Sequence, residues 1–166
     1  MCIRDSSQVI AVDPSGEVAW RRGGEGQGPG EFRTPHALEF DSQGRLFVAD
    51  RGNHRIQIFD QDGNYLDSYY QFGRISGLFI TDDDTLYAID SESDRIRHPN
   101  WRNGVRIGHA TEDKVTAFIP PHFSDSRLLG TAGEGVAVDA DGNVYAAEGP
   151  NSRRQAGGGL TKYLAR

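Results

Sequence analysis

The chain has 166 residues, 21 of them glycine, and a formal net charge of −6. This length suits a single domain, and the abundant glycine with modest apolar content favours many short strands over long helices. The acidic balance argues against a nucleic-acid surface, which needs clustered Lys and Arg. The single cysteine, Cys2, excludes an internal disulfide and a thiolate metal cluster. No apolar stretch approaches the length of a membrane span.

The first residues of the chain follow no repeat. Residues 1–6 fit no strand and show no secretory signal, so we interpret them as a non-native leader. Residues 8–20 then place two apolar runs around the turn sequence Asp13-Pro14-Ser15-Gly16. Such a turn joins antiparallel strands, so this segment predicts a β-hairpin.

Three later segments share one pattern. Residues 38–50, 78–90 and 136–148 each contain a short apolar run, a polar turn and a second apolar run that ends on an acid. Asp and Asn side chains bond to the backbone two residues on, and Gly accepts positive φ at no steric cost. Each segment therefore predicts two antiparallel strands joined by a tight turn.

The spacing of these turns indicates a repeat architecture. Gly44 and Asp84 lie 40 positions apart, which is the length of one four-stranded propeller blade. Asp84 and Gly142 lie 58 positions apart, so the second unit is 18 residues longer. We place this insertion between Gly108 and Gly133.

The second half of the unit repeats as well. Residues 53–66 predict strand, turn and strand, and residues 93–96 hold the same register 40 positions later. Arg55 and Arg95 recur at matching places in this register. Recurrence at blade spacing indicates a structural role between blades more than a chemical one.

The sequence therefore predicts an all-β propeller, present as a partial ring of about three blades. The expected organisation is a leader, residues 1–6, followed by one propeller fragment, residues 7–166. Blades of the same protein that precede this fragment are its expected structural partner. The fragment divides into the outer hairpin of a preceding blade, a blade, a blade with the insertion, and a final incomplete blade: residues 7–32, 33–72, 73–132 and 133–166.

The run Thr34-Pro35-His36-Ala37-Leu38, followed by residues 48–60, resembles an NHL repeat. Within that family the blade is similar to one of peptidyl-α-hydroxyglycine α-amidating lyase, a six-bladed propeller. The resemblance implies zinc, bound by a Pro-His motif at the start of each of three inner strands, and an arginine near the substrate. Pro35-His36 matches the first motif, so His36 is the implied zinc ligand. Arg51 matches the second and is the implied catalytic residue.

The chain departs from this pattern in its other blades. The position equivalent to His36 is Ser76 in the next blade and Glu134 in the last. A carboxylate can ligate zinc through oxygen, so Glu134 is the second candidate metal ligand. The catalytic tyrosine of the family would lie in a blade that this chain lacks, so we expect the chain alone to be inactive. Each candidate also has a structural alternative. His36 could be a channel histidine bonded to the backbone, and Glu134 a solvated acid. Arg51 could form a salt bridge to Asp50 or to a neighbouring blade.

Calcium is less favoured than zinc. Two turns, at Asp60 and Asp139, begin like a calcium-binding loop. Their twelfth positions are Gln71 and Pro150, where an EF-hand needs an acid.

Two functions remain open at this stage. The first is a zinc-dependent, lyase-like or hydrolase-like enzyme whose remaining ligands lie in preceding blades. The second is a non-catalytic propeller that binds a peptide, glycan or protein partner. Either function places a small-molecule or peptide ligand at the channel mouth, with no nucleic-acid partner. The resemblance favours an extracellular or periplasmic protein. His98, His109 and His122, in or near the insertion, enter neither hypothesis.

Overall fold

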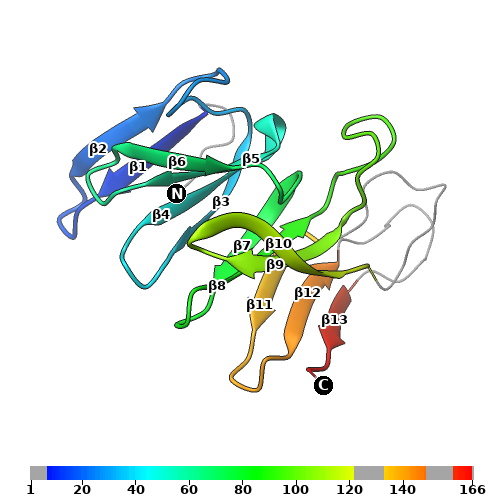
Figure 1. Cartoon of the computed structure of the whole chain (residues 1–166). Coiled ribbons are helices and arrows are strands. Elements are labelled where there is room, and N and C mark those ends of the chain that lie inside the picture. Colours follow the sequence, from blue (N-terminus) through cyan, green and yellow to red (C-terminus); the bar gives the residue numbers. More distant parts are fainter. Residues whose placement is uncertain (1–6, 122–132, 149–158, 166) are drawn as a thin grey trace.

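The computed structural model describes residues 7–121, 133–148 and 159–165, in which strands form four separate antiparallel sheets (Figure 1). The expectation of an all-β chain is confirmed, because the one helical element among these residues is a single 3-10 turn. No helix in this part of the chain is long and apolar enough to cross a membrane.

Two of the sheets have four strands each, paired in chain order. The strands of the first, with the 3-10 turn η1 between its second and third, are β3 (Pro35–Phe40), β4 (Leu46–Asp50), η1 (Arg51–Asn53), β5 (Arg55–Phe59) and β6 (Tyr65–Tyr69). The strands of the second are β7 (Ile75–Ile80), β8 (Thr85–Asp90), β9 (Gly104–His109) and β10 (Glu112–Ile119).

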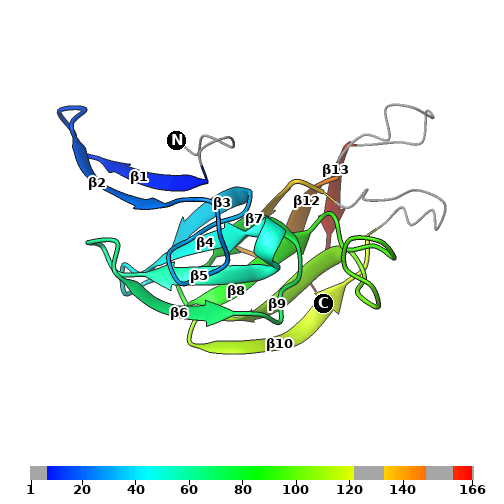
Figure 2. The same ribbon diagram turned by 90° about the horizontal axis from the view of Figure 1, so that it is seen from above.

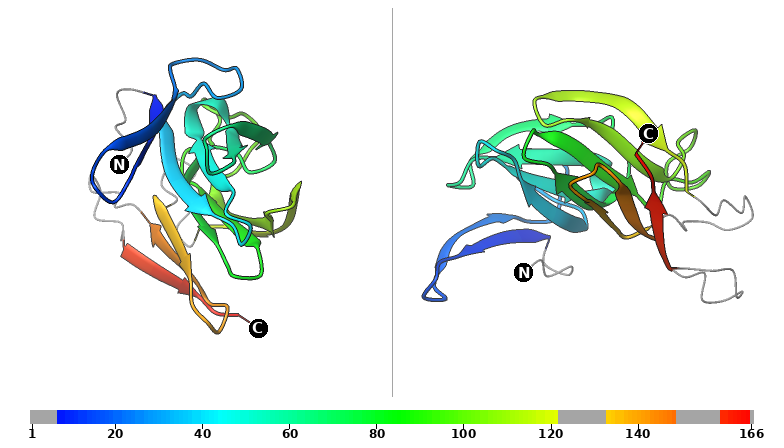
Figure 3. Two further views of the ribbon diagram at one scale, coloured as in Figure 1. Left: turned by 90° about the vertical axis from the view of Figure 1, so that its left-hand side faces the viewer. Right: turned by 90° about the horizontal axis from the view of Figure 1, so that it is seen from below.

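The two smaller sheets flank this pair, one on each side (Figures 1 and 2). They are the hairpin β1 (Gln8–Val12) and β2 (Val18–Gly23), and the sheet of β11 (Gly135–Val138), β12 (Val144–Glu148) and β13 (Gly159–Tyr163). The first strands of successive sheets pack side by side, β3 against β7 and β7 against β11, as the views in Figure 3 show. This is the arrangement of propeller blades around an axis.

The turns follow the predicted chemistry. In the β3–β4 turn the Asp41 carboxylate accepts hydrogen bonds from the backbone N–H groups of Gln43 and Arg45, at 3.1 and 2.8 Å. Gly44 completes the turn at φ +75°, where a glycine has no steric penalty. The β7–β8 turn instead places Asp84 at φ +62°. Its carboxylate accepts hydrogen bonds from Ser42 in the turn of the preceding blade, so it links two blades.

The core lies between neighbouring sheets. Successive side chains of a strand point to opposite faces, so β4 contributes to two clusters. Leu46 and Val48 pack toward the β1–β2 hairpin with Val9 and Phe32. The alternate residues of β4 pack toward the second four-stranded sheet. Burial on both faces explains why this strand is apolar throughout and why each blade depends on its neighbour.

A buried ion pair closes the same end of both four-stranded sheets. Asp50, the last residue of β4, is fully buried and accepts a hydrogen bond from Arg55 Nε at 2.8 Å. Arg55 Nη2 donates hydrogen bonds to the carbonyl oxygens of Gly28 and Glu31, in the segment that leads into the blade. The prediction of an inter-blade structural role for Arg55 agrees with these contacts.

The second blade uses a different arginine from the one expected. Asp90 pairs with Arg106 Nη1 at 2.9 Å, while Arg95 is exposed. The cause is the connection between the second and third strands, which takes residues 51–54 in the first blade and residues 91–103 here. The assignment of the third strand to residues 93–96 is therefore wrong. Part of the insertion lies in this loop, ahead of the position predicted for it.

One glycine sets the spacing between the inner strands of neighbouring sheets. A Cβ at Gly77 on β7 would lie 3.0 Å from the Glu134 carbonyl oxygen and 3.0 Å from Gly135 Cα. Contacts this short require the neighbour to shift. The absence of a side chain at Gly77 therefore lets β11 approach β7 closely.

We expect Asp50→Asn to lower the free energy of unfolding by about 3–5 kcal/mol, because it leaves the buried Arg55 without a counter-charge. Chemical denaturation followed by circular dichroism would measure the loss. Asp62→Asn is the matched control, since Asp62 is exposed and its side chain makes no hydrogen bond with the described residues. We expect it to change stability by about 0.5 kcal/mol or less. Equal losses in both variants would contradict the role given to Asp50.

Candidate functional site

The three residues singled out from the sequence lie together at the end of the inner strands. His36 is on β3, Arg51 begins η1, and Glu134 directly precedes β11. The Glu134 Oε2 atom lies 3.4 Å from His36 Nε2 and 3.7 Å from Arg51 Nη1. The sites therefore form one cluster that spans the first and third of three neighbouring sheets. The chemical roles proposed for these residues remain predictions.

The orientation of the His36 ring is fixed by the middle sheet. Its Nδ1 atom lies 2.7 Å from the Ser76 carbonyl oxygen, which only accepts hydrogen bonds, so Nδ1 carries a proton. In the neutral ring, Nε2 then has a lone pair facing the Glu134 carboxylate. Two acceptors in this position favour a cation or a proton between them. This backbone contact also fits the simpler expectation of a channel histidine bonded to backbone.

The separation of these two atoms fits two ligands of a tetrahedral zinc ion. Zinc bonds of about 2.0–2.1 Å at the tetrahedral angle place two ligand atoms about 3.3 Å apart. The 3.4 Å between His36 Nε2 and Glu134 Oε2 agrees with this value. The described residues contain no group of three or more His, Cys, Asp or Glu that could hold a metal. His36 and Glu134 alone therefore do not make a complete metal site among these residues.

Ser76 stands where the resemblance expects another histidine, and it supports the cluster in a different way. Its hydroxyl lies 2.5 Å from the Ser91 hydroxyl and 3.2 Å from Arg51 Nη1, which donates to it. Its carbonyl holds His36. Ser76 thus positions two of the candidate residues and occupies the middle of the cluster.

Arg51 faces the neighbouring sheets and not the acid next to it in sequence. Asp50 pairs with Arg55, whereas Arg51 Nη1 lies 3.9 Å from Glu92 Oε1. The Arg51 side chain is 12% exposed. These contacts match the alternative expectation of a salt bridge from Arg51 to a neighbouring blade.

Sequence reasoning missed Arg74 and Glu92, which extend this charged cluster. Arg74 Nη2 donates to Glu92 Oε2 at 2.7 Å, and Arg74 Nη1 lies 2.8 Å from His54 Nε2. Burial opposes ionisation of Glu92, but the hydrogen bond from Arg74 and the charge of Arg51 outweigh it and lower its pKa. Both residues flank strand ends at the same edge as Arg51, which was the available signal.

A stack of rings lies beside the cluster and includes one of the unassigned histidines. His98 packs between His54 and Trp101, with ring centroids 4.3 and 4.5 Å away. The guanidinium group of Arg106 lies over the Trp101 ring, with its central carbon 4.7 Å from the ring centroid. Burial first, and then the neighbouring positive groups, lowers the pKa of His98 from 6.5 to about 4. Its neutral form is therefore the one that the fold stabilises. His122 lies outside the described residues.

The similarity to known proteins agrees with this architecture. The NHL repeat family matches residues 32–59. This segment is an NHL repeat. NHL repeat-containing protein 3 from Homo sapiens is 42% identical over 65 residues, which cover 39% of this chain and 19% of that protein.

Two further similarities extend over most of the chain. Peptidyl-glycine alpha-amidating monooxygenase A from Xenopus laevis is 29% identical over 149 residues, covering 84% of this chain and 15% of that protein. The chain thus spans less than a fifth of the length of these relatives. The solved structure of RRP9 WD40 repeats superposes with a TM-score of 0.65 at 18% identity, over 87% of this chain and 39% of that one. This likeness confirms the propeller fold.

The lowered pKa of His98 predicts acid sensitivity. Because the folded value of about 4 lies below the unfolded value of 6.5, its contribution to stability is complete above pH 6.5. We expect that contribution to be lost progressively as the pH falls from 6.5 to 4. His98→Phe keeps a ring in the stack without a titrating group, so its melting temperature should fall less over this range. His109→Gln, outside the stack, should retain the wild-type profile. Identical profiles for wild type and His98→Phe would contradict this assignment.

Proposed function

We propose that the NHL propeller binds zinc at the channel mouth through His36 and Glu134, and that the longer protein is a lyase-like enzyme of the peptidyl-glycine amidating type. The observation that carries the proposal is the 3.4 Å approach of His36 Nε2 to Glu134 Oε2, with Nδ1 held by the Ser76 carbonyl. A ligating histidine commonly donates its other ring N–H in this way. The 29% identity to the Xenopus laevis protein over most of the chain supports the same function.

The residues of the cluster would have separate roles in metal binding and ligand binding. His36 and Glu134 would hold the ion, which when bound supplies a Lewis acid for a carbonyl or hydroxyl oxygen. Arg51 would bind the carboxylate or carbonyl of the ligand, and Ser76 and Glu92 would keep its guanidinium in place. The remaining metal ligands would come from water or from preceding blades.

We expect His36→Ala to abolish stoichiometric zinc in the longer protein that contains this chain. Glu134→Gln should weaken zinc binding, because an amide oxygen is a poorer ligand than a carboxylate. Zinc content by atomic emission and affinity by competition with a chelating dye would measure both effects. His109→Ala is the matched control and should bind zinc like the wild type. Wild-type protein without zinc, or unchanged zinc in His36→Ala, would refute the metal site.

The second candidate is a non-catalytic propeller that binds a peptide, glycan or protein partner at the same mouth. Arg51 fits this candidate, because Ser76, Glu92 and Glu134 position its side chain through direct contacts. Peptide binding that persists with a chelator and is lost in Arg51→Gln would support this candidate over the enzyme.

A further inference from the structure

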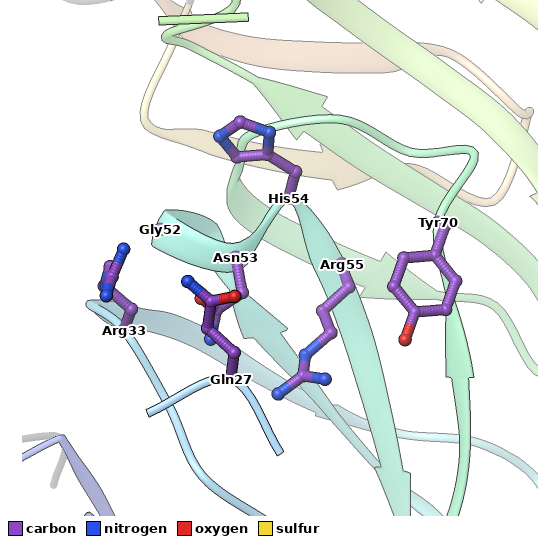
Figure 4. Close-up of a pocket in the computed structure, with 7 residues that line it drawn as sticks. All are labelled: Gln27, Arg33, Gly52, Asn53, His54, Arg55 and Tyr70. Atoms are coloured by element: carbon purple, nitrogen blue, oxygen red, sulfur yellow. The ribbon is translucent and has the colours of Figure 1, made fainter. Parts of the chain in front are cut away.

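A pocket opens beside η1, with a volume of about 560 Å³. It shares no lining residue with the cluster of His36, Arg51 and Glu134. Figure 4 shows its walls, which come from the segment that leads into the first blade, from η1 and β5, and from the residue after β6. The lining residues are Gln27, Arg33, Gly52, Asn53, His54, Arg55 and Tyr70.

The walls of this pocket are positively charged although the chain as a whole carries a net charge of −6. They include two guanidinium groups and no carboxylate. Asp50 lies buried next to Arg55 and balances its charge. Arg33 is exposed, and its guanidinium makes no hydrogen bond or ion pair with the described residues. One net positive charge therefore remains at the opening.

Arg55 is held rigidly at the wall. Burial alone would lower its pKa, but the Asp50 carboxylate and the Tyr70 hydroxyl outweigh burial and raise it. Its Nε and Nη2 atoms are engaged with Asp50 and with the backbone of the lead-in segment. These partners neutralise Arg55 and occupy most of its donors, so Arg55 shapes the wall of the pocket, and Arg33 supplies the charge at the opening.

The pocket is larger than an inorganic anion needs. Tyr70 is 55% exposed, and Figure 4 shows its ring beyond Arg55, on the side away from Arg33. Asn53 donates through Nδ2 to the Gly26 carbonyl and to Asp50, so its side-chain oxygen remains an acceptor. The walls therefore offer charge on one side, an aromatic surface on the other and a polar acceptor between them.

We propose that this pocket binds an organic anion, with a carboxylate or phosphate group at the exposed Arg33 and an apolar portion against Tyr70. Bidentate contact with a guanidinium suits both kinds of anion. This site is independent of the channel mouth and of the function proposed for it.

The test is a titration of the 166-residue chain with three matched probes, N-acetylphenylalanine, its amide, and phenyl phosphate, followed by amide NMR. We expect the first and third to bind and the amide to bind about tenfold more weakly or worse, because it lacks the charge. The tighter of the two anions identifies the natural class. Shifts should centre on Gly52, Asn53 and Tyr70, and affinity should fall with added salt.

Two arginine variants complete the test. Arg33→Gln should weaken anion binding about five- to tenfold, since it removes the exposed charge without touching the buried Asp50–Arg55 pair. Arg21→Gln, at an exposed arginine on β2 outside the pocket, should bind like the wild type. Any of four results would overturn the proposal: no binding at millimolar probe, equal binding of the amide, equal loss in both variants, or shifts centred on Ser76 and Ser91.

Discussion

The buried carboxylate at the end of the second strand of a blade is the constraint on which the arrangement of the candidate site depends. Asp50 and Asp90 occupy the same place in successive blades, and each neutralises a guanidinium from the third strand. A buried charge without its partner is strongly destabilising, so both pairs must form if the blades are to close. Candidate site residues follow these acids in the sequence: Arg51 comes directly after Asp50, and Glu92 lies two positions after Asp90. The pairs thus fix the loops that carry the site.

The elements that the sequence predicted well are those whose determinants are local. An acid that caps its own turn and a glycine at positive φ are contained within a few residues, as at Asp41 and Gly44. The sequence prediction misplaced the third strand of the second blade because a fixed register requires the same loop length in both blades. The longer connection, residues 91–103, moves the partner of Asp90 from the expected Arg95 to Arg106.

The sequence predicted which residues make up the candidate site. It did not predict the residues that surround them. Resemblance to NHL propellers pointed to His36, Arg51 and Glu134, and the fold brings them within hydrogen-bonding or ion-pairing range of one another. The ring stack of His54, His98 and Trp101 forms between loops of different blades. No local pattern marks such neighbours, because their proximity exists only once the blades have packed.

Gly77 links the spacing of the inner strands to the geometry of the candidate site. The residue touches no candidate ligand through a side chain, yet the backbone that bears Glu134 rests directly against it. A single methyl group there would wedge the inner strands apart by a few tenths of an ångström. Glu134 would then move away from His36 although neither of these residues had been changed. The 3.4 Å between His36 Nε2 and Glu134 Oε2 therefore depends on the close packing of two blades at Gly77 as well as on the two side chains themselves.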